Sequence, residues 1–196
     1  MRHLLFWILY FTISTVLASP KVSVVTRETE FDGCHFKIRD PYKGSLRLTT
    51  DGAPPLAVYT ATFNLKVRHS VGEVSIHFYC DTMEGNNAFV ALGFEKQGRA
   101  WVLLPNKSDP DNLLNKKLYP LKSPGIEGAA STYDQTTGEL SDRVQSLGFC
   151  LTNQKQILCG TSEEVAYVAY PKASSLPQVL KLLESIEFLE PTAKSP

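Results

Sequence analysis

The sequence predicts an α+β protein, mainly antiparallel β-sheet in two packed lobes, with one amphipathic helix near the C-terminus. Three observations support this prediction. Short segments alternate polar and apolar residues and are separated by turn residues, which is typical of antiparallel strands. One late segment repeats its apolar residues with helical spacing. Four cysteines, Cys34, Cys80, Cys150 and Cys159, follow an apolar N-terminal segment and suit a disulfide-stapled fold.

The N-terminal segment has the features of a secretory signal. It begins with Met1-Arg2-His3, continues as an apolar run from Leu4 to Val16, and ends in small residues around Ala18. A positive start, a short apolar core and a small-residue cleavage site define such signals, and this core is shorter than a membrane-spanning helix. We expect residues 1–18 to be removed and the protein to be periplasmic or secreted, without a membrane anchor.

Residues 19–104 are expected to form an N-terminal lobe rich in β-strands. Turn signals such as Asp51-Gly52 and Gln97-Gly98 separate the alternating segments. The expected strands cover residues 22–26, 34–39, 45–49, 58–67, 74–80, 88–94 and 100–104.

The segment 105–125 is expected to be a long connecting loop between the two lobes. It contains Pro105, Pro110, Pro120 and Pro124 among Asn, Asp and Lys residues. Proline removes a backbone donor, and a connection of this length inside a compact chain is either functional or a boundary.

Residues 126–190 are expected to form a C-terminal lobe with a hairpin and the helix. Strands are predicted at 130–133, 143–147, 164–170 and 185–188, with a turn at 134–138. For the helix, Ser175 is the candidate N-cap and Pro177 suits the first turn. The apolar stripe consists of Val179, Leu180, Leu182, Leu183 and Ile186. Residues 191–196 are expected to be a disordered tail.

The four cysteines predict two disulfides, for which three pairings exist. Cys150 and Cys159 flank a polar turn, so their sulfur atoms would meet across a hairpin. Cys34 and Cys80 would then pair by elimination. The chain-entropy model assigns about 2–3 kcal/mol to the short loop and about 4 kcal/mol to the long one. A zinc site is the alternative, but the CxxC spacing of zinc sites is missing.

Composition and motifs argue against several classes of function. The chain has 20 basic and 20 acidic residues, which argues against the basic face of a nucleic-acid binder. It has no Gly-x-Ser-x-Gly, HExxH or GxxxxGK[ST] motif. We therefore expect no enzymatic activity and no cofactor, although a catalytic triad that assembles only in the folded chain would carry no such motif.

Two clusters of possible metal ligands have simpler interpretations. The Cys34–Cys80 bridge would bring His35 and His77 into one region, but outward-facing strand residues are the favoured interpretation. The run from Asp109 to Asn112 lacks the glycine and the final Glu of a calcium-binding loop, so a solvated turn is favoured. We therefore expect no metal site.

The order of features in the last third of the chain resembles that of a known family. Gly148-Phe149-Cys150-Leu151 ends a strand, Ile157-Leu158-Cys159-Gly160 closes the following turn, and an amphipathic helix ends at Leu183-Glu184-Ser185-Ile186-Glu187-Phe188. This arrangement resembles exported bacterial immunity proteins that protect a cell from type VI secretion effectors. The resemblance implies a periplasmic protein that binds and neutralises a cognate protein effector, without catalytic residues.

The expected partner-binding site is the polar segment 106–117, because flanking prolines would limit the entropy lost on binding. Its expected contact residues are Asp109, Asp111, Asn112, Lys116 and Lys117. The next choice is the sheet face around Tyr59 and His77. Exposed aromatic residues such as Tyr133 are either interface anchors or half-buried sheet residues, and the second interpretation is favoured. Two other functions stay open: an exported hydrolase with an unmarked active site, and a secreted β-protein that binds a small ligand.

Overall fold

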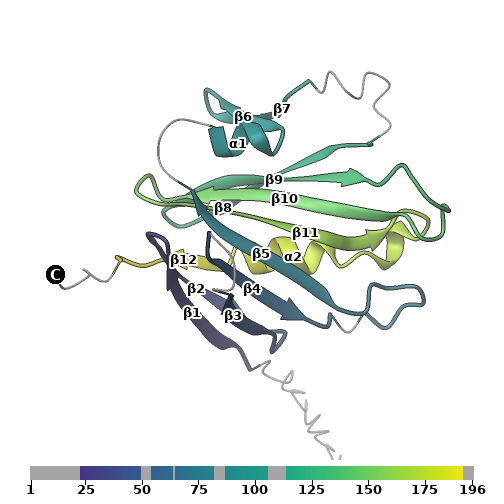
Figure 1. Ribbon diagram of the computed structural model, residues 1–196, viewed down its shortest axis with the longest axis horizontal. Helices are drawn as coiled ribbons and strands as arrows, with labels where there is room; N and C mark the ends of the chain where they lie inside the picture. The colour runs from purple at the N-terminus through teal and green to yellow at the C-terminus, as the bar shows by residue number, and fades with distance from the viewer. Residues whose placement is uncertain (1–22, 50–53, 64, 82–86, 106–113, 192–196) are drawn as a thin grey trace, which may run out of the picture.

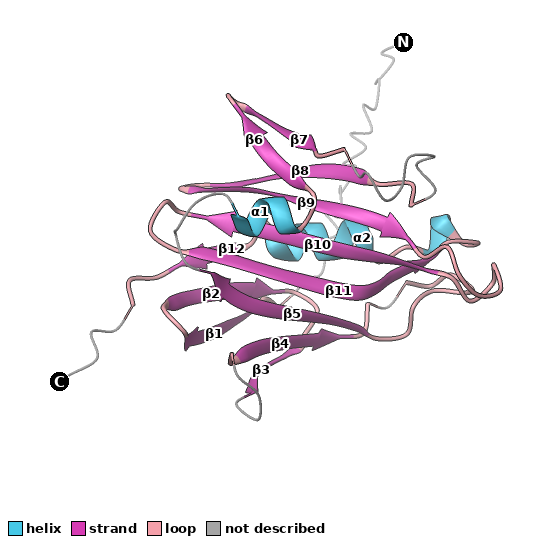
Figure 2. Ribbon diagram, turned by 45° about the horizontal axis from the view of Figure 1, so that its top comes forward, coloured by secondary structure: helices cyan, strands magenta, loops and turns pink. Residues whose placement is uncertain are grey.

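The computed structural model describes residues 23–49, 54–63, 65–81, 87–105 and 114–191. The expected signal peptide and residues 192–196 of the expected tail lie outside these ranges. Figures 1 and 2 show a large central sheet with a small layer that contains α1 on one face and a larger layer that contains α2 on the other. We call these the outer and the inner face of the central sheet.

Short antiparallel strands make up most of the described chain. The strands are β1 (Val25–Phe31), β2 (Cys34–Asp40), β3 (Ser45–Thr49), β4 (Leu56–Ala61), β5 (Val74–Asp81), β6 (Phe94–Gln97), β7 (Ala100–Leu103), β8 (Lys117–Ser123), β9 (Ile126–Asp134), β10 (Val144–Thr152), β11 (Ile157–Tyr167) and β12 (Ile186–Phe188). The helices are α1 (Asn87–Ala91), the 3-10 helix η1 (Pro171–Ala173) and α2 (Leu176–Leu183). This content confirms the α+β class.

The central sheet has seven strands in the order β3-β4-β5-β11-β10-β9-β8. A three-stranded sheet, β1-β2-β12, lies on its inner side, and the β6–β7 hairpin accompanies α1 on the outer side. Every pair of neighbouring strands is antiparallel. Alternate residues of the central strands therefore face the inner and the outer layer.

The central sheet crosses the expected boundary between two lobes. β5 pairs with β11, and β2 pairs with β12, so strands from both halves of the chain share each sheet. The prediction of a connecting loop over 105–125 is wrong for residues 117–123, which form β8 and pair with β9. Because β8 is the last strand of the sheet, Pro120 interrupts no second ladder, and edge strands tolerate proline for this reason.

The predicted strand over residues 88–94 is also wrong, because Asn87–Ala91 is the helix α1 and β6 begins at Phe94. A short apolar run does not distinguish a buried strand from a buried helix. Here Ala88 and Phe89 are buried against the outer face of the sheet. Gly93, with φ of 81°, ends the helical turn, and its N–H donates to the carbonyl of Val90 at 2.9 Å.

Both predicted disulfides are present. Cys150 and Cys159 lie opposite each other in the β10–β11 register, with their Cα atoms 4.0 Å apart. The Cys34–Cys80 bridge joins β2 to β5 and so ties the three-stranded sheet to the central sheet. Two disulfides indicate folding in an oxidising compartment. No helix among the described residues is long and apolar enough to span a membrane.

The inner face of the central sheet is covered by α2 and the three-stranded sheet. Leu176, Val179, Leu182 and Leu183 of α2 are buried, which confirms the predicted apolar stripe apart from Ile186, which belongs to β12. Ser175 occupies the predicted N-cap position, but its side chain makes no capping hydrogen bond. Ser174 Oγ instead accepts a hydrogen bond from the N–H of Leu176 at 3.1 Å.

Candidate functional site

The outer face of the central sheet is only partly covered. Phe89, Phe94 and Trp101, from α1 and the β6–β7 hairpin, pack over the Cys150–Cys159 disulfide. Lys96 Nζ in β6 binds Glu127 Oε1 of β9 at 2.6 Å and holds this layer on the sheet. Beyond the layer, small and polar residues continue across the sheet. One such row runs through His77, Thr161, Gly148 and Ser131.

A groove of about 550 Å³ lies where the covering layer ends. Val90 and the following residues of the α1 segment form one wall, and Tyr133 of β9 forms part of the other. These two side chains are 44% and 41% exposed, although both are large and apolar in character. Exposed apolar side chains that face a common groove are typical of a surface that binds another molecule.

The groove is built by close packing of the segment after α1 on the sheet. A side chain at Gly148 would place its Cβ 3.1 Å from Leu92 Cδ2, so glycine allows Leu92 to approach β10. Ser131 Oγ donates to the carbonyl of Leu92 at 3.2 Å. The N–H of Leu104 donates to the carbonyl of Gly93 at 2.8 Å, which holds the other end of the wall. The wall and floor of the groove are therefore held by contacts within the protein.

Lys116 is the one charged residue among the described residues that line this groove. Its Nζ lies beside Gly93, where a Cβ would be 3.4 Å from the ammonium group. Within the described parts of the chain, no ion pair joins Lys116 to an acidic side chain. The groove thus combines apolar walls with one available positive charge.

The structure separates the two predicted lysine contacts. Lys116 lines the groove on the outer face, whereas Lys117 lines a different cavity, of about 450 Å³, on the inner face. Lys117 pairs with Thr132, whose neighbour Leu147 belongs to the inner core. The two lysines therefore face different sides of the sheet edge, because consecutive residues of an extended chain point to opposite sides, and their role as partner contacts stays a prediction. The other predicted contacts, Asp109, Asp111 and Asn112, lie outside the described residues.

Of the two residues that define the second predicted surface, His77 is exposed and Tyr59 is not. His77 is exposed on the outer face, in a cleft of about 160 Å³ that Ser75 and Glu163 also line. No hydrogen bond joins His77 to Ser75 among the described residues. Tyr59 is fully buried on the inner face and donates its hydroxyl to Asp40 Oδ1 at 2.8 Å. Burial and this hydrogen bond raise the Tyr59 pKa above its ordinary value.

His35 is not the outward-facing residue that the sequence favours. It is 9% exposed, its Nε2 lies 2.9 Å from Glu28 Oε1, and its Nδ1 lies 2.8 Å from the carbonyl oxygen of Glu190. Both neighbours accept hydrogen bonds, so both ring nitrogens donate only in the imidazolium form. The hydrogen bond to Glu28 raises the pKa of His35, against the opposing effect of burial. Among the described residues, no group of three or more His, Cys, Asp or Glu side chains is placed to hold a metal ion.

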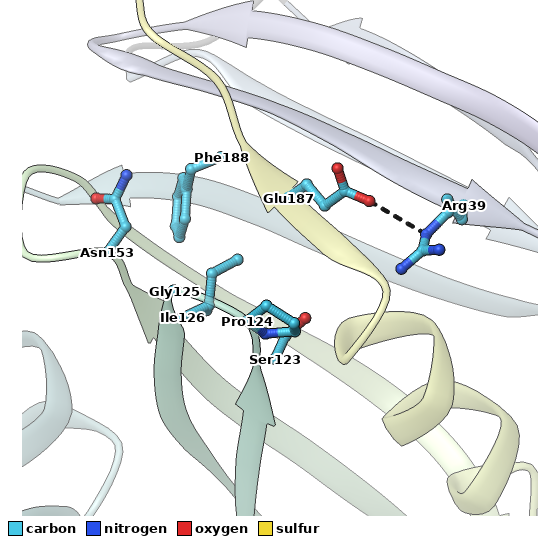
Figure 3. A pocket seen from close by; sticks show the side chains of 8 residues that line it. All are labelled: Arg39, Ser123, Pro124, Gly125, Ile126, Asn153, Glu187 and Phe188. Atoms are coloured by element: carbon cyan, nitrogen blue, oxygen red, sulfur yellow. Dashed lines mark ion pairs between the residues drawn. The ribbon is translucent and has the colours of Figure 1, made fainter.

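Figure 3 shows another cavity, of about 460 Å³, between β12 and the β8–β9 turn. Phe188 and Ile126 form its apolar part, and the Arg39–Glu187 ion pair lies at one end. Glu187 is bound by both Lys37 Nζ, at 3.0 Å, and Arg39 Nε, at 3.2 Å. The hydrogen bond from Lys37 lowers the pKa of Glu187. These two ion pairs hold β12 on β2, which is a structural role, so we place the candidate site in the outer groove instead.

Sequence patterns contain few features that predict this groove. Gly148 inside a predicted strand region is a usable signal, because glycine in a strand often marks a close approach of another segment. The exposure of Val90 depends on the helix α1, whereas the sequence pattern favoured a strand in this region. Comparison of the chain with protein-family models, with curated proteins and with solved structures found no match.

Proposed function

We propose that this is an exported binding protein that holds another protein in the outer groove, and that its partner is an antibacterial effector that it neutralises. The observation that carries the proposal is the groove itself, with Val90 and Tyr133 exposed on its walls and Lys116 at its side, where no acidic side chain of the described residues forms an ion pair with it. The two disulfides and the N-terminal segment support export to the periplasm. The resemblance of the last third of the chain to type VI immunity proteins supports the class of partner.

The chemistry of the groove indicates what the partner presents. Apolar walls favour an aliphatic or aromatic side chain, and Lys116 favours a carboxylate beside it. The walls are held by α1 and β9, so few residues have to become ordered on binding. Tyrosine is among the residues that most often dominate the binding energy of an interface, and Tyr133 is therefore the expected anchor.

A pull-down from periplasmic extract identifies the partner, and calorimetry with point variants tests the groove. We expect Lys116→Glu and Tyr133→Ala to weaken binding by about tenfold or more, because an interface anchor is worth about 1–3 kcal/mol. Lys181→Ala, an exposed change on α2, is the matched control and should bind like the wild type. Tyr133 and Lys181 are exposed and Lys116 is half-buried without an ion pair among the described residues, so all three variants should melt near the wild-type temperature.

Coexpression with the identified partner tests whether binding neutralises that partner. The wild-type protein and Lys181→Ala should abolish the toxicity of the partner, and the two groove variants should not. Equal binding by all the variants would move the contact surface away from the groove. A partner without toxicity would contradict the effector part of the proposal and leave the groove as a protein-binding site.

A further inference from the structure

The cavity on the inner face lies between the central sheet and the start of α2. Its volume is about 450 Å³. Residues of β8 to β11, η1 and α2 line it, among them Lys117, Tyr119, Asp134, Gln145, Tyr167 and Ser174. It is separated from the outer groove by the thickness of the sheet, so a ligand here would not compete with a partner there.

Asp134, at the end of β9, is a buried carboxylate in this cavity. It is 9% exposed. Asn115 Nδ2 donates to its Oδ2 at 2.9 Å, and Gln145 Nε2 donates to its Oδ1 at 2.8 Å. Both donors are neutral amides. Within the described ranges, no Lys, Arg or His side chain forms an ion pair with Asp134.

The other deeply buried aspartate shows how this fold compensates such a charge internally. Asp40 is fully buried, and Arg27 Nε lies 3.6 Å from its Oδ2. Its Oδ1 also accepts hydrogen bonds from the Tyr59 hydroxyl and from the N–H of Tyr42. Buried carboxylates are usually paired with a cation in this way, because desolvation of a lone charge is costly. Asp134 has the hydrogen bonds without the cation, and it faces a cavity.

We propose that this cavity binds an organic cation, an ammonium or guanidinium group, with Asp134 as its counter-ion. Each carboxylate oxygen retains acceptor capacity after its bond to an amide. The position of Asn115 beside Asp134 is fixed by the backbone. Asn115 has a left-handed conformation, with φ of 44°, and the N–H of Asp134 donates to the carbonyl of the preceding residue, Leu114, at 2.7 Å. Tyr119 and Tyr167 supply aromatic surface, which also attracts cations.

Lys117 narrows the class of ligand. It is exposed and lines the same cavity, so it repels a second cation and attracts a carboxylate. The ligand therefore carries its cationic group close to a carboxylate. A free amino acid meets this description, and so does a lysine or arginine side chain of a protein when an acidic residue lies next to it. These two sources share one chemistry and are separated by the experiment.

The test is an NMR titration of the ¹⁵N-labelled protein with four probes: L-lysine, L-arginine, cadaverine and the peptide acetyl-Glu-Lys-Gly-amide. We expect saturable shifts of the side-chain amide signals of Asn115 and Gln145. Asp134→Asn should weaken binding at least tenfold, whereas Asp142→Asn, an exposed acidic control, should not. Lys117→Glu should strengthen binding of cadaverine and weaken binding of L-lysine, a change of preference that a loss of structure would not produce.

The outcomes separate cleanly. Tighter binding of the free amino acids supports a small-molecule ligand, and tighter binding of the peptide supports a side chain of a protein partner. The absence of saturable shifts with all four probes would overturn the proposal. Unchanged binding of the probes by Asp134→Asn would also overturn it. If that variant does not fold, an unchanged preference between cadaverine and L-lysine in Lys117→Glu would overturn it. None of these results depends on whether the outer groove binds an effector.

Discussion

The two faces of the central sheet carry very different cores. On the inner face, a large cluster joins both sheets and α2, and Phe78 connects Phe36 to Phe149 at centroid distances of 5.3 and 5.5 Å. On the outer face, a small cluster around Phe89, Phe94 and Trp101 covers only the end of the sheet that carries the Cys150–Cys159 bridge. The inner face is therefore expected to supply most of the stability, whereas part of the outer face has no covering layer.

The largest expected effect comes from the inner face. Leu182→Ala should lower the free energy of unfolding by about 2–5 kcal/mol, because the side chain is 1% exposed and its removal leaves a cavity. Lys181→Ala, the neighbouring exposed residue of α2, should change it by about 0.5 kcal/mol or less. Urea unfolding followed by circular dichroism measures both. Equal midpoints for the two variants would contradict the assignment of the inner face as the main source of stability.

A smaller effect is expected on the outer face. The double change Cys150→Ala and Cys159→Ala should lower stability by about 2–3 kcal/mol, because the bridge closes a short loop of the unfolded chain. The same unfolding experiment applies, with the Cys34–Cys80 bridge left intact and checked by non-reducing peptide mapping. A loss well above that of Leu182→Ala would reverse the comparison, since the smaller cluster would then be the more important one.

The smallest effect concerns pH and the rim of the inner layer. The pKa of His35 is raised in the folded protein, so protonated His35 favours folding. Its contribution should be complete below the ordinary histidine pKa of about 6.5 and should be lost as pH rises through the raised value. Wild-type stability relative to His35→Gln should therefore fall across that range. A difference between the two proteins that stays constant from acid to alkaline pH would show that the imidazolium contacts are not energetically important.

Features that depend on neighbouring residues in the chain were predictable. The Cys150–Cys159 pair and the α2 stripe follow from spacing alone, and the alternation from 74 to 80 matches β5. Features that depend on register were not. The opposite sides of Lys116 and Lys117 follow from the pairing of β8 with β9, which a proline-containing segment does not suggest. Asp134 was expected in a turn, and no local pattern indicates that an acidic residue at a strand end is buried.

The connectivity of the disulfides has a consequence for how the protein matures. The first cysteine is bonded to the second and the third to the fourth, at separations of 46 and 9 residues. For a polypeptide that emerges from a translocation channel N-terminus first, Cys80 arrives when Cys34 is the only other thiol on the far side. The second pair then appears after the first has closed. If each pair closes in order of emergence, the native bridges form without any exchange between disulfides, which is the step that an isomerase catalyses.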